Sequence, residues 1–294
     1  MDAESVDLCV TSIPFSGLFM YSGKPEDIGN NADGTDSRDS DFGIHMRFFV
    51  EQLYRVMKPG TLSCIHTQQL VTYAVQHGYQ GRRDFRGACI DIFGAGGFNY
   101  FGEVAIPKNP QAIAQRQKLH SLLFVTGRRD ARGLSPAVND FLLIFKKPGE
   151  HPDPVPALLH DLNPGGWVTS NEWIKWAHGT WADIQETDVL DGYRSAREDE
   201  DERHVCPLQL EVIRRCIKLY SNPGELVLDP FMGIGSTAYV AVEQGRNAVG
   251  FELKESYHRQ ALANVAKIEA ELANQGTAAN PLDLFAFAGV AVGS

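Results

Sequence analysis

The sequence predicts an α/β fold in which helices cover both faces of an open, doubly wound, mixed sheet, with one irregular insertion. Short apolar runs at residues 6–10, 61–66 and 141–145 have the length and composition of buried strands. Segments 42–57 and 208–219, with apolar residues at helical spacing, alternate with them. The chain has 294 residues and is 43% hydrophobic, which is enough to bury a full core without crosslinks.

The remaining elements follow from the same signals. Further helices are expected at 84–92, 109–124 and 255–272, and a further strand at 99–106. The five cysteines show no C-x-x-C pair and are interpreted as reduced residues. His66, directly after the strand at 61–66, is interpreted as a core or rim histidine rather than a functional one.

The clearest unit is a strand, a glycine turn, a helix and a second strand within residues 223–252. Its parts are, in order, a strand at 225–228, a turn at Gly233 and Gly235, a helix capped by Ser236 and Thr237, and a strand at 248–251 that ends in Glu252. Such a turn and the helix N-terminus after it receive an anionic or polar group, and an acid about twenty residues further on accepts from ribose hydroxyls. The sequence therefore predicts an adenosine-cofactor site, with a ligand-free crossover as the alternative.

Two features indicate that the cofactor is not a dinucleotide. Ala238 stands where G-x-G-x-x-G has its third glycine, and Asp229 precedes the turn. A carboxylate there would repel a pyrophosphate, whereas it suits a cofactor with a positive charge.

DPFMGIGST (229–237) resembles the DPF-x-G-x-G-[ST]-T motif of amino-methyltransferases, which bind S-adenosylmethionine. TSIPF (11–15) resembles their catalytic motif [DNST]-P-P-[YFW], with Ile13 in place of the first proline. The catalytic motif precedes the cofactor motif, an order similar to that of the β group of DNA amino-methyltransferases of Rossmann-like fold. The layout also resembles methylases of phages and prophages.

The resemblance implies a site for each substrate. Ser12 and the carbonyl of Ile13 would accept the hydrogens of the target amine, Pro14 would shape the turn, and Phe15 would stack on the extruded base. Such a transfer needs positioning and no metal. The residues implied to bind the cofactor are Asp229, Pro230, Phe231, Gly233, Gly235, Ser236, Thr237, Glu252, Cys206 and Leu208.

The resemblance leaves several alternatives. The substrate would be double-stranded DNA with a flipped base, and the leading serine favours cytosine N4 over adenine N6 without deciding between them. An RNA amino-methyltransferase, or a catalytically silent subunit that binds the cofactor, are the other hypotheses. Ile13 is the departure that favours the silent subunit.

The charge distribution offers one candidate surface for nucleic acid. The net charge is −10, but residues 108–132 contain six Lys or Arg against one acid. The candidate contacts are Arg116, Lys118, Arg128, Arg129 and Arg132. A solvated helix face is the alternative. The insertion, with its four tryptophans between 167 and 181, is a second candidate, although a local aromatic core is the favoured interpretation.

These motifs suggest a division of the chain into a catalytic half (1–149), an insertion (150–205), a cofactor half (206–275) and a tail (276–294). Within the tail, PLDLF (281–285) resembles peptides that dock on the bacterial sliding clamp. No apolar run is long enough to span a membrane, so a cytoplasmic protein is expected. The strand near residue 1 suggests part of a larger polypeptide, and a homodimer is also considered.

Overall fold

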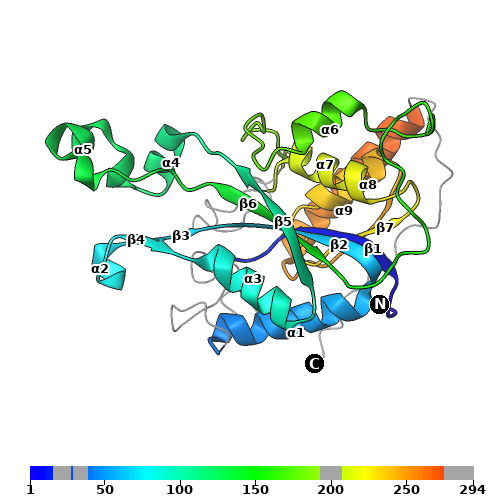
Figure 1. The fold of residues 1–294 in the computed structure, drawn as a ribbon, viewed down its shortest axis with the longest axis horizontal. Coiled ribbons are helices and arrows are strands. Elements are labelled where there is room, and N and C mark those ends of the chain that lie inside the picture. The colour runs from blue at the N-terminus through cyan, green and yellow to red at the C-terminus, as the bar shows by residue number, and fades with distance from the viewer. Residues whose placement is uncertain (16–27, 29–38, 193–206, 275–294) are drawn as a thin grey trace.

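The computed structural model describes residues 1–15, 28, 39–192 and 207–274. Its centre is a six-stranded sheet of order β5-β6-β2-β1-β7-β8 (Figure 1). The strands are β1 (Val6–Ser12), β2 (Met57–Gln68), β5 (Asn99–Ile106), β6 (Asp140–Lys146), β7 (Leu226–Asp229) and β8 (Asn247–Gly250). β2, β1, β7 and β8 are parallel, and β6 is antiparallel to β2 and β5. The predicted doubly wound mixed sheet is confirmed.

Helices cover both faces of this sheet (Figure 1). On one face lie α1 (Asp41–Val56) and α3 (Phe85–Ala95), and on the other lie α7 (Leu210–Tyr220), α8 (Ser236–Glu243) and α9 (Glu255–Asn274). The alternation of β1 side chains explains the two layers, because Leu8 and Val10 belong to the cluster under α7–α9 while Cys9 belongs to the cluster under α1 and α3.

Local chemistry sets where several helices begin. The hydroxyl of Ser40 accepts from the Gly43 N–H at the start of α1, and the carboxylate of Asp84 accepts from the Gly87 N–H at the start of α3. The helix expected at 84–92 therefore begins one residue later and extends to Ala95.

Beyond one end of the sheet, residues 70–83 and 109–138 form a projecting lobe (Figure 1). It consists of β3 (Leu70–Thr72), α2 (Ala74–His77), β4 (Gly81–Arg83), α4 (Pro110–Arg116), a 3₁₀ turn at His120–Leu122, α5 (Phe124–Arg129) and a second 3₁₀ turn at Ala131–Gly133. A small apolar cluster joins its two parts and comprises Val71, Ile113, Leu119 and Val138.

The single helix predicted over 109–124 is wrong. α4 ends at Arg116, and Lys118 adopts the left-handed conformation with φ 50°. That backbone conformation cannot continue a right-handed helix, so the chain turns before α5. Residues 110–129 therefore form two short helices separated by a turn, rather than one continuous helix.

The segment after β6 packs against α7 through its tryptophans. Trp176 and Trp181 are buried, and Trp181 Nε1 donates to the Trp176 carbonyl at 2.9 Å. Both rings lie against the guanidinium of Arg215, which is only 2% exposed and pairs with Asp183 at 2.6 Å. The interpretation as a local aromatic core is thus confirmed for these two residues, whereas Trp173 is exposed.

No helix in the part of the chain that the structure describes combines the length and the hydropathy needed to cross a membrane.

Candidate active site

The two predicted motifs meet at one edge of the sheet. β1 and β7 are parallel neighbours, so Ser12 at the end of one strand lies beside Asp229 at the end of the other. The Thr11 hydroxyl donates to Asp229 Oδ1 at 2.5 Å, across 218 residues of sequence, and the Thr237 hydroxyl donates to the Val10 carbonyl at 3.2 Å. These hydrogen bonds fasten both motifs into a single site at the carboxyl ends of neighbouring strands, where doubly wound sheets bind ligands.

The glycines of the β7–α8 loop have different tasks. Gly233 and Gly235 adopt φ values of 54° and 86°, which favour glycine. A Cβ on Gly235 would lie 2.9 Å from the Cβ of Ala261 on α9, whereas a Cβ on Gly233 would meet no atom within 4 Å. Gly235 therefore permits close packing of the loop on α9, and Gly233 leaves backbone facing open space that a ligand can enter.

Ser236 and Thr237 do not cap α8, contrary to the prediction. The N-cap is Gly235, and no side chain accepts from the first N–H groups of the helix. Both residues are buried within the first turn, where the Thr237 hydroxyl bonds to β1 instead. The backbone N–H groups at this end of α8 have no side-chain cap among the described residues.

Glu252, just past β8, closes the loop from the other side. Its Oε2 accepts from the Gly233 N–H at 2.9 Å and its Oε1 accepts from the Lys254 N–H at 2.8 Å. Each carboxylate oxygen has a second lone pair, so the side chain can still accept from the hydroxyls of a ribose.

Burial sets the protonation behaviour of both acids. Burial raises the pKa of Asp229, although hydrogen bonds from the Thr11 hydroxyl and the Phe231 N–H oppose the rise. Burial also raises the pKa of Glu252, and the charge of Asp229 adds to that effect. Neither acid forms an ion pair with any residue that the structure describes, so the loop offers uncompensated negative charge to a cationic ligand.

Ser12 is linked by hydrogen bonds to a series of buried polar side chains. Its Oγ lies 2.9 Å from His66 Nδ1, and His66 Nε2 lies 2.9 Å from Asp140 Oδ2. Lys108 Nζ lies 2.6 Å from the same oxygen of Asp140. Burial alone would raise the pKa of Asp140, but His66 and Lys108 hold it below its usual value. The histidine is buried with both ring nitrogens bonded, as expected, yet one of those bonds reaches the candidate catalytic serine.

Sequence reasoning missed Asp140 and placed Lys108 at the edge of a basic surface. Strand register is what brings them together. Ser12 pairs with His66 across β1–β2, and Asp140 pairs with Gln68 across β2–β6. On the other side Asp140 pairs with Ile106 across β5–β6, two residues before Lys108. No short sequence pattern encodes these pairings. The polar residue that opens the otherwise apolar strand at 141–145 was the only available signal.

Ile13 replaces proline without disrupting the turn. Its side chain is buried in the cluster that includes Phe42 and Met46. Its N–H donates to the His66 carbonyl at 3.4 Å, which a proline could not do. In the family motif the ring of a proline restricts the backbone at this position. Here the hydrogen bond from Ile13 to β2 orients the backbone instead.

Pro14 and Phe15 complete the motif. Both are half-buried, and the ring of Phe15 lies 6.0 Å from that of His66 and 6.3 Å, edge-on, from that of Phe85. The ring is thus held beside Ser12 at the mouth of the site.

The other residues expected at the cofactor divide into three groups. Pro230 is half-buried in the loop after β7, and Phe231 packs on Phe49 with ring centroids 5.0 Å apart. Leu208, before α7, is buried in the same cluster as Met232 and Ile234 of the loop. Cys206 lies outside the described residues.

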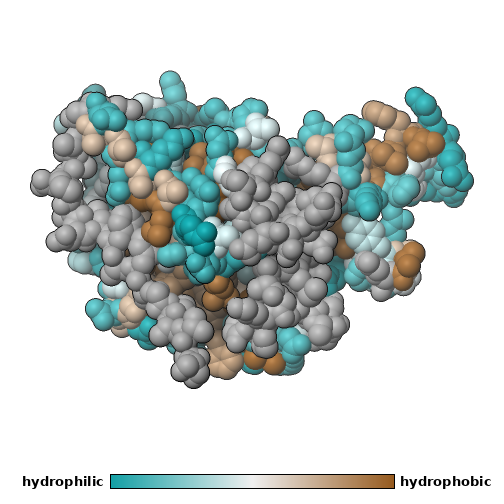
Figure 2. Space-filling model, turned by 180° about the vertical axis from the view of Figure 1, so that it is seen from behind, coloured by the Kyte–Doolittle hydropathy of each residue, from teal (hydrophilic) through white to brown (hydrophobic). Residues whose placement is uncertain are grey.

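The basic residues do not gather at this site. Lys118, Arg128, Arg129 and Arg132 are exposed on the projecting lobe, and Arg132 forms a hydrogen-bonded ion pair with Asp130 at 2.8 Å. Arg116 lies at the end of α4. Exposed apolar side chains accompany them, and Figure 2 shows brown atoms beside teal ones on this lobe. The exposed large apolar residues there are Val75, Tyr79, Phe124, Val125 and Leu134.

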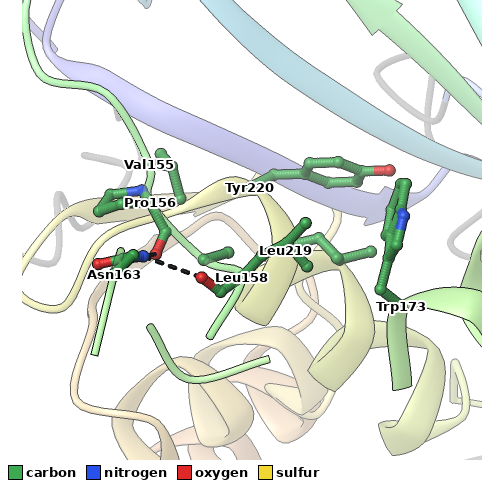
Figure 3. A pocket seen from close by; sticks show the side chains of 8 residues that line it. Val155, Pro156, Leu158, Asn163, Trp173, Leu219 and Tyr220 are labelled. Carbon is green, nitrogen blue, oxygen red and sulfur yellow. Dashed lines mark hydrogen bonds between the residues drawn. The ribbon is translucent and has the colours of Figure 1, made fainter. Parts of the chain in front are cut away.

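A separate hollow of about 430 Å³ lies between the segment 155–163, Trp173 and the end of α7 (Figure 3). Apolar side chains of Val155, Leu158, Leu219 and Tyr220 line it, together with Trp173. An adjoining hollow reaches Asp7 and Glu225, near the amino ends of β1 and β7. The chemical groups described above all lie at the carboxyl ends, so this apolar hollow is not the candidate active site.

Residues 6–263 match the model of the DNA methylase family N6_N4_Mtase. The chain belongs to this family. Type II methyltransferase M.BglI of Bacillus subtilis is 35% identical over 132 residues, which is 44% of this chain and 32% of that protein. This chain thus spans about a third of the length of that curated relative.

Solved structures agree on the fold. A protein of Thermus thermophilus assigned as a DNA modification methylase, in complex with S-adenosyl-L-methionine, superposes with a TM-score of 0.63 at 18% identity over 91% of this chain and 88% of that one. The cytosine-N4-specific PvuII DNA methyltransferase superposes with a TM-score of 0.56 at 17% identity over 93% of this chain and 86% of that one.

Proposed function

We propose that this member of the DNA methylase family transfers a methyl group from S-adenosylmethionine to the exocyclic amine of a flipped base in double-stranded DNA. The observation that carries the proposal is the Thr11–Asp229 hydrogen bond at 2.5 Å, which holds the TSIPF motif against the DPFMGIGST loop. Family membership and the S-adenosylmethionine bound to the Thermus thermophilus relative support the choice of cofactor.

The loop residues suit this cofactor. Asp229, buried and without an ion-pair partner among the described residues, attracts its positively charged methionine end. The open space next to Gly233 leaves room for the cofactor, and Glu252 accepts hydrogen bonds from the ribose hydroxyls of the cofactor. When bound, the cofactor supplies a sulfonium methyl group that a nitrogen lone pair can attack.

The residues of TSIPF suit the amine. The nitrogen of an exocyclic amine is a poor nucleophile because its lone pair is delocalised into the base. Ser12 Oγ and the carbonyl of Ile13 accept its hydrogens and so keep the lone pair on the nitrogen. Pro14 shapes the turn, and Phe15 stacks on the base.

We place the DNA backbone on the projecting lobe. Its exposed cations at 118, 128, 129 and 132 can neutralise phosphates, and Phe124 and Val125 beside them are exposed. The segment at 155–183, by contrast, packs its apolar side chains against α7, so we do not place DNA on it. Ser12 at the head of the motif favours cytosine N4, with adenine N6 as the alternative. A DNA substrate also favours a cytoplasmic location.

The test is methyl transfer itself. We expect tritium from labelled S-adenosylmethionine to enter unmethylated bacterial or phage DNA with the wild type, and not with Phe15→Ala or Asp229→Ala. Calorimetry should show that Phe15→Ala still binds the cofactor whereas Asp229→Ala binds it weakly. Digestion of the labelled DNA to nucleosides names the base.

Other outcomes point elsewhere. Cofactor binding without transfer to any nucleic acid would indicate a silent subunit, as Ile13 alone would suggest. Transfer to RNA but not to double-stranded DNA would indicate an RNA enzyme. Sliding-clamp docking through Pro281–Phe285, outside the described residues, and homodimerisation or fusion to further domains stay predictions that pull-down and ultracentrifugation can test.

A further inference from the structure

We propose that His66 and Asp140 are positioning residues that turn Ser12 into the acceptor of the amine proton. The inference rests on the proposed methyl transfer and adds a proton path to it. The path follows the buried contacts Ser12 Oγ–His66 Nδ1 and His66 Nε2–Asp140 Oδ2, both 2.9 Å.

The partners of His66 decide its tautomer. Asp140, held ionised by the Lys108 ammonium, can only accept a hydrogen bond, so His66 Nε2 must carry a hydrogen. In the neutral ring Nδ1 then has only a lone pair and accepts from the Ser12 hydroxyl. With that hydrogen directed at His66, the lone pairs of Ser12 Oγ are available to an incoming amine.

The proton balance of the reaction calls for such an acceptor. As the nitrogen–methyl bond forms and the sulfur–methyl bond breaks, the amine nitrogen becomes positively charged and must lose one proton. That proton moves to Ser12 Oγ while the hydroxyl proton of Ser12 moves to His66 Nδ1. The products are the methylated amine, the neutral thioether and an imidazolium beside the Asp140 carboxylate.

Lys108 sets the charge of this path. Its ammonium lies 2.6 Å from Asp140 Oδ2 and is only 13% exposed, so it compensates the buried carboxylate before reaction. Without Lys108, the carboxylate would instead stabilise a positive His66 in the resting state. A positively charged His66 could not accept a proton, so the Lys108–Asp140 ion pair serves the path by balancing the carboxylate in place of the histidine.

Other titratable groups lie near the path. From β7, Asp229 bonds to Thr11, the neighbour of Ser12. On α3 and β5, Arg86 and Glu103 form an ion pair with each other, and Arg86 lies over the Phe141 ring on β6. Glu186 accepts from the backbone N–H of Asn109, next to Lys108. Burial raises the pKa of Asp229, so the test must separate the effect of that acid on the pH profile from the effect of changing His66.

The test is the pH dependence of single-turnover methyl transfer. In His66→Asn the amide oxygen can still accept from Ser12 but does not titrate. We expect its rate at neutral pH to fall about 100-fold, a common size for the loss of an acid–base group, and the acidic limb of the profile to flatten. His178→Asn, the same change at an exposed histidine, serves as the matched control.

Two further variants should move the acidic limb in opposite directions. Lys108→Gln leaves Asp140 to favour the imidazolium, so the limb should shift to higher pH. Asp140→Asn removes the negative charge and should shift it to lower pH, with a slower maximal rate. A merely structural role for these residues predicts no such opposite shifts. Thermal unfolding and cofactor calorimetry on each variant show whether fold and binding are retained.

The outcomes are separable. Wild type that binds the cofactor but methylates nothing would overturn the proposed function, and the proton path with it. Active wild type together with a His66→Asn protein of unchanged rate and unchanged acidic limb would overturn the path alone. If Lys108→Gln and Asp140→Asn shift the limb in the same direction, the charge assignment fails.

Discussion

The two motifs of the candidate active site reach their geometry by different physical means. The TSIPF motif on β1 depends on side chains, since Ser12 is oriented by His66 and Ile13 is buried in the core. The DPFMGIGST loop depends mainly on its backbone, with left-handed glycines and an N–H that donates to Glu252. The first arrangement is sensitive to protonation and the second to an added Cβ.

This difference matters because the two proposed substrates, a target amine and S-adenosylmethionine, differ in what they require. An amine must give up a proton, which calls for titratable side chains in a buried network. A cofactor that stays intact until transfer needs a binding surface of complementary shape. Glycine backbone, which carries no side chain, can approach the cofactor closely. Thr11 and Thr237 are where the two arrangements join.

The largest effect is expected for Gly235→Ala. Its φ of 86° is strained for alanine, and its Cβ would lie 3.1 Å from the Cα of Ala261. We expect the free energy of unfolding to fall by about 2 kcal/mol or more and cofactor binding to be lost. Thermal unfolding and calorimetry check this. Gly245→Ala, with φ 70° and no atom within 4 Å of its Cβ, is the matched control for strain alone.

Gly233→Ala should separate binding from stability. A Cβ at this glycine meets no protein atom, so stability should fall by only about 1 kcal/mol, as in Gly245→Ala. The same methyl would occupy space on the ligand side, and the affinity for cofactor should fall at least roughly 10-fold. Equal affinities in Gly233→Ala and Gly245→Ala would mean that the cofactor does not approach this loop.

Asp229→Asn should raise the stability of the fold and weaken the binding of the cofactor. Because burial raises the pKa of Asp229, the folded protein binds this proton more readily than the unfolded chain does. The ionised carboxylate therefore costs stability above its folded pKa, and the cost disappears below about pH 4, the value for an unfolded chain. The variant should melt a few degrees higher than wild type at neutral pH, with a difference that closes on acidification, while it binds cofactor more weakly. A lower melting temperature at neutral pH would show that the hydrogen bonds from Thr11 and Phe231 outweigh burial.

Substitutions in the projecting lobe are expected to affect the two motifs least. Replacing Arg128, Arg129 and Arg132 by Gln should leave cofactor affinity unchanged and weaken DNA binding. For each phosphate that the variant no longer neutralises, the slope of log affinity against log salt should become shallower by about 0.9. Arg259→Gln, an exposed arginine on α9, is the control. An unchanged slope would make the lobe a solvated surface, the other interpretation of its charge.

The sequence allowed the fold class to be predicted because hydrophobic periodicity is a local signal. Strand β5 was expected at 99–106 and lies at Asn99–Ile106, and α1, expected at 42–57, lies at Asp41–Val56. The error at 109–124 arose at Lys118, whose left-handed backbone has no residue-level signal, since glycine or asparagine is the usual sign of such a turn.

The adjacency of the two motifs was predictable from strand order. Both follow buried strands, and parallel strands of a doubly wound sheet present their carboxyl ends at one edge. The capping role assigned to Ser236 and Thr237 was wrong because tertiary contacts with β1 engage the Thr237 hydroxyl, while Gly235 supplies the turn.

The sequence by itself determined the central sheet, the long helices that cover it and the two motifs, since periodicity, glycines and short motifs are properties of neighbouring residues. Only the tertiary structure decided what stands behind Ser12. His66, Lys108 and Asp140 are far apart in the chain, and the register of β1, β2, β6 and β5 brings them within hydrogen-bond distance. Register depends on the packing of the entire sheet, which no local pattern encodes.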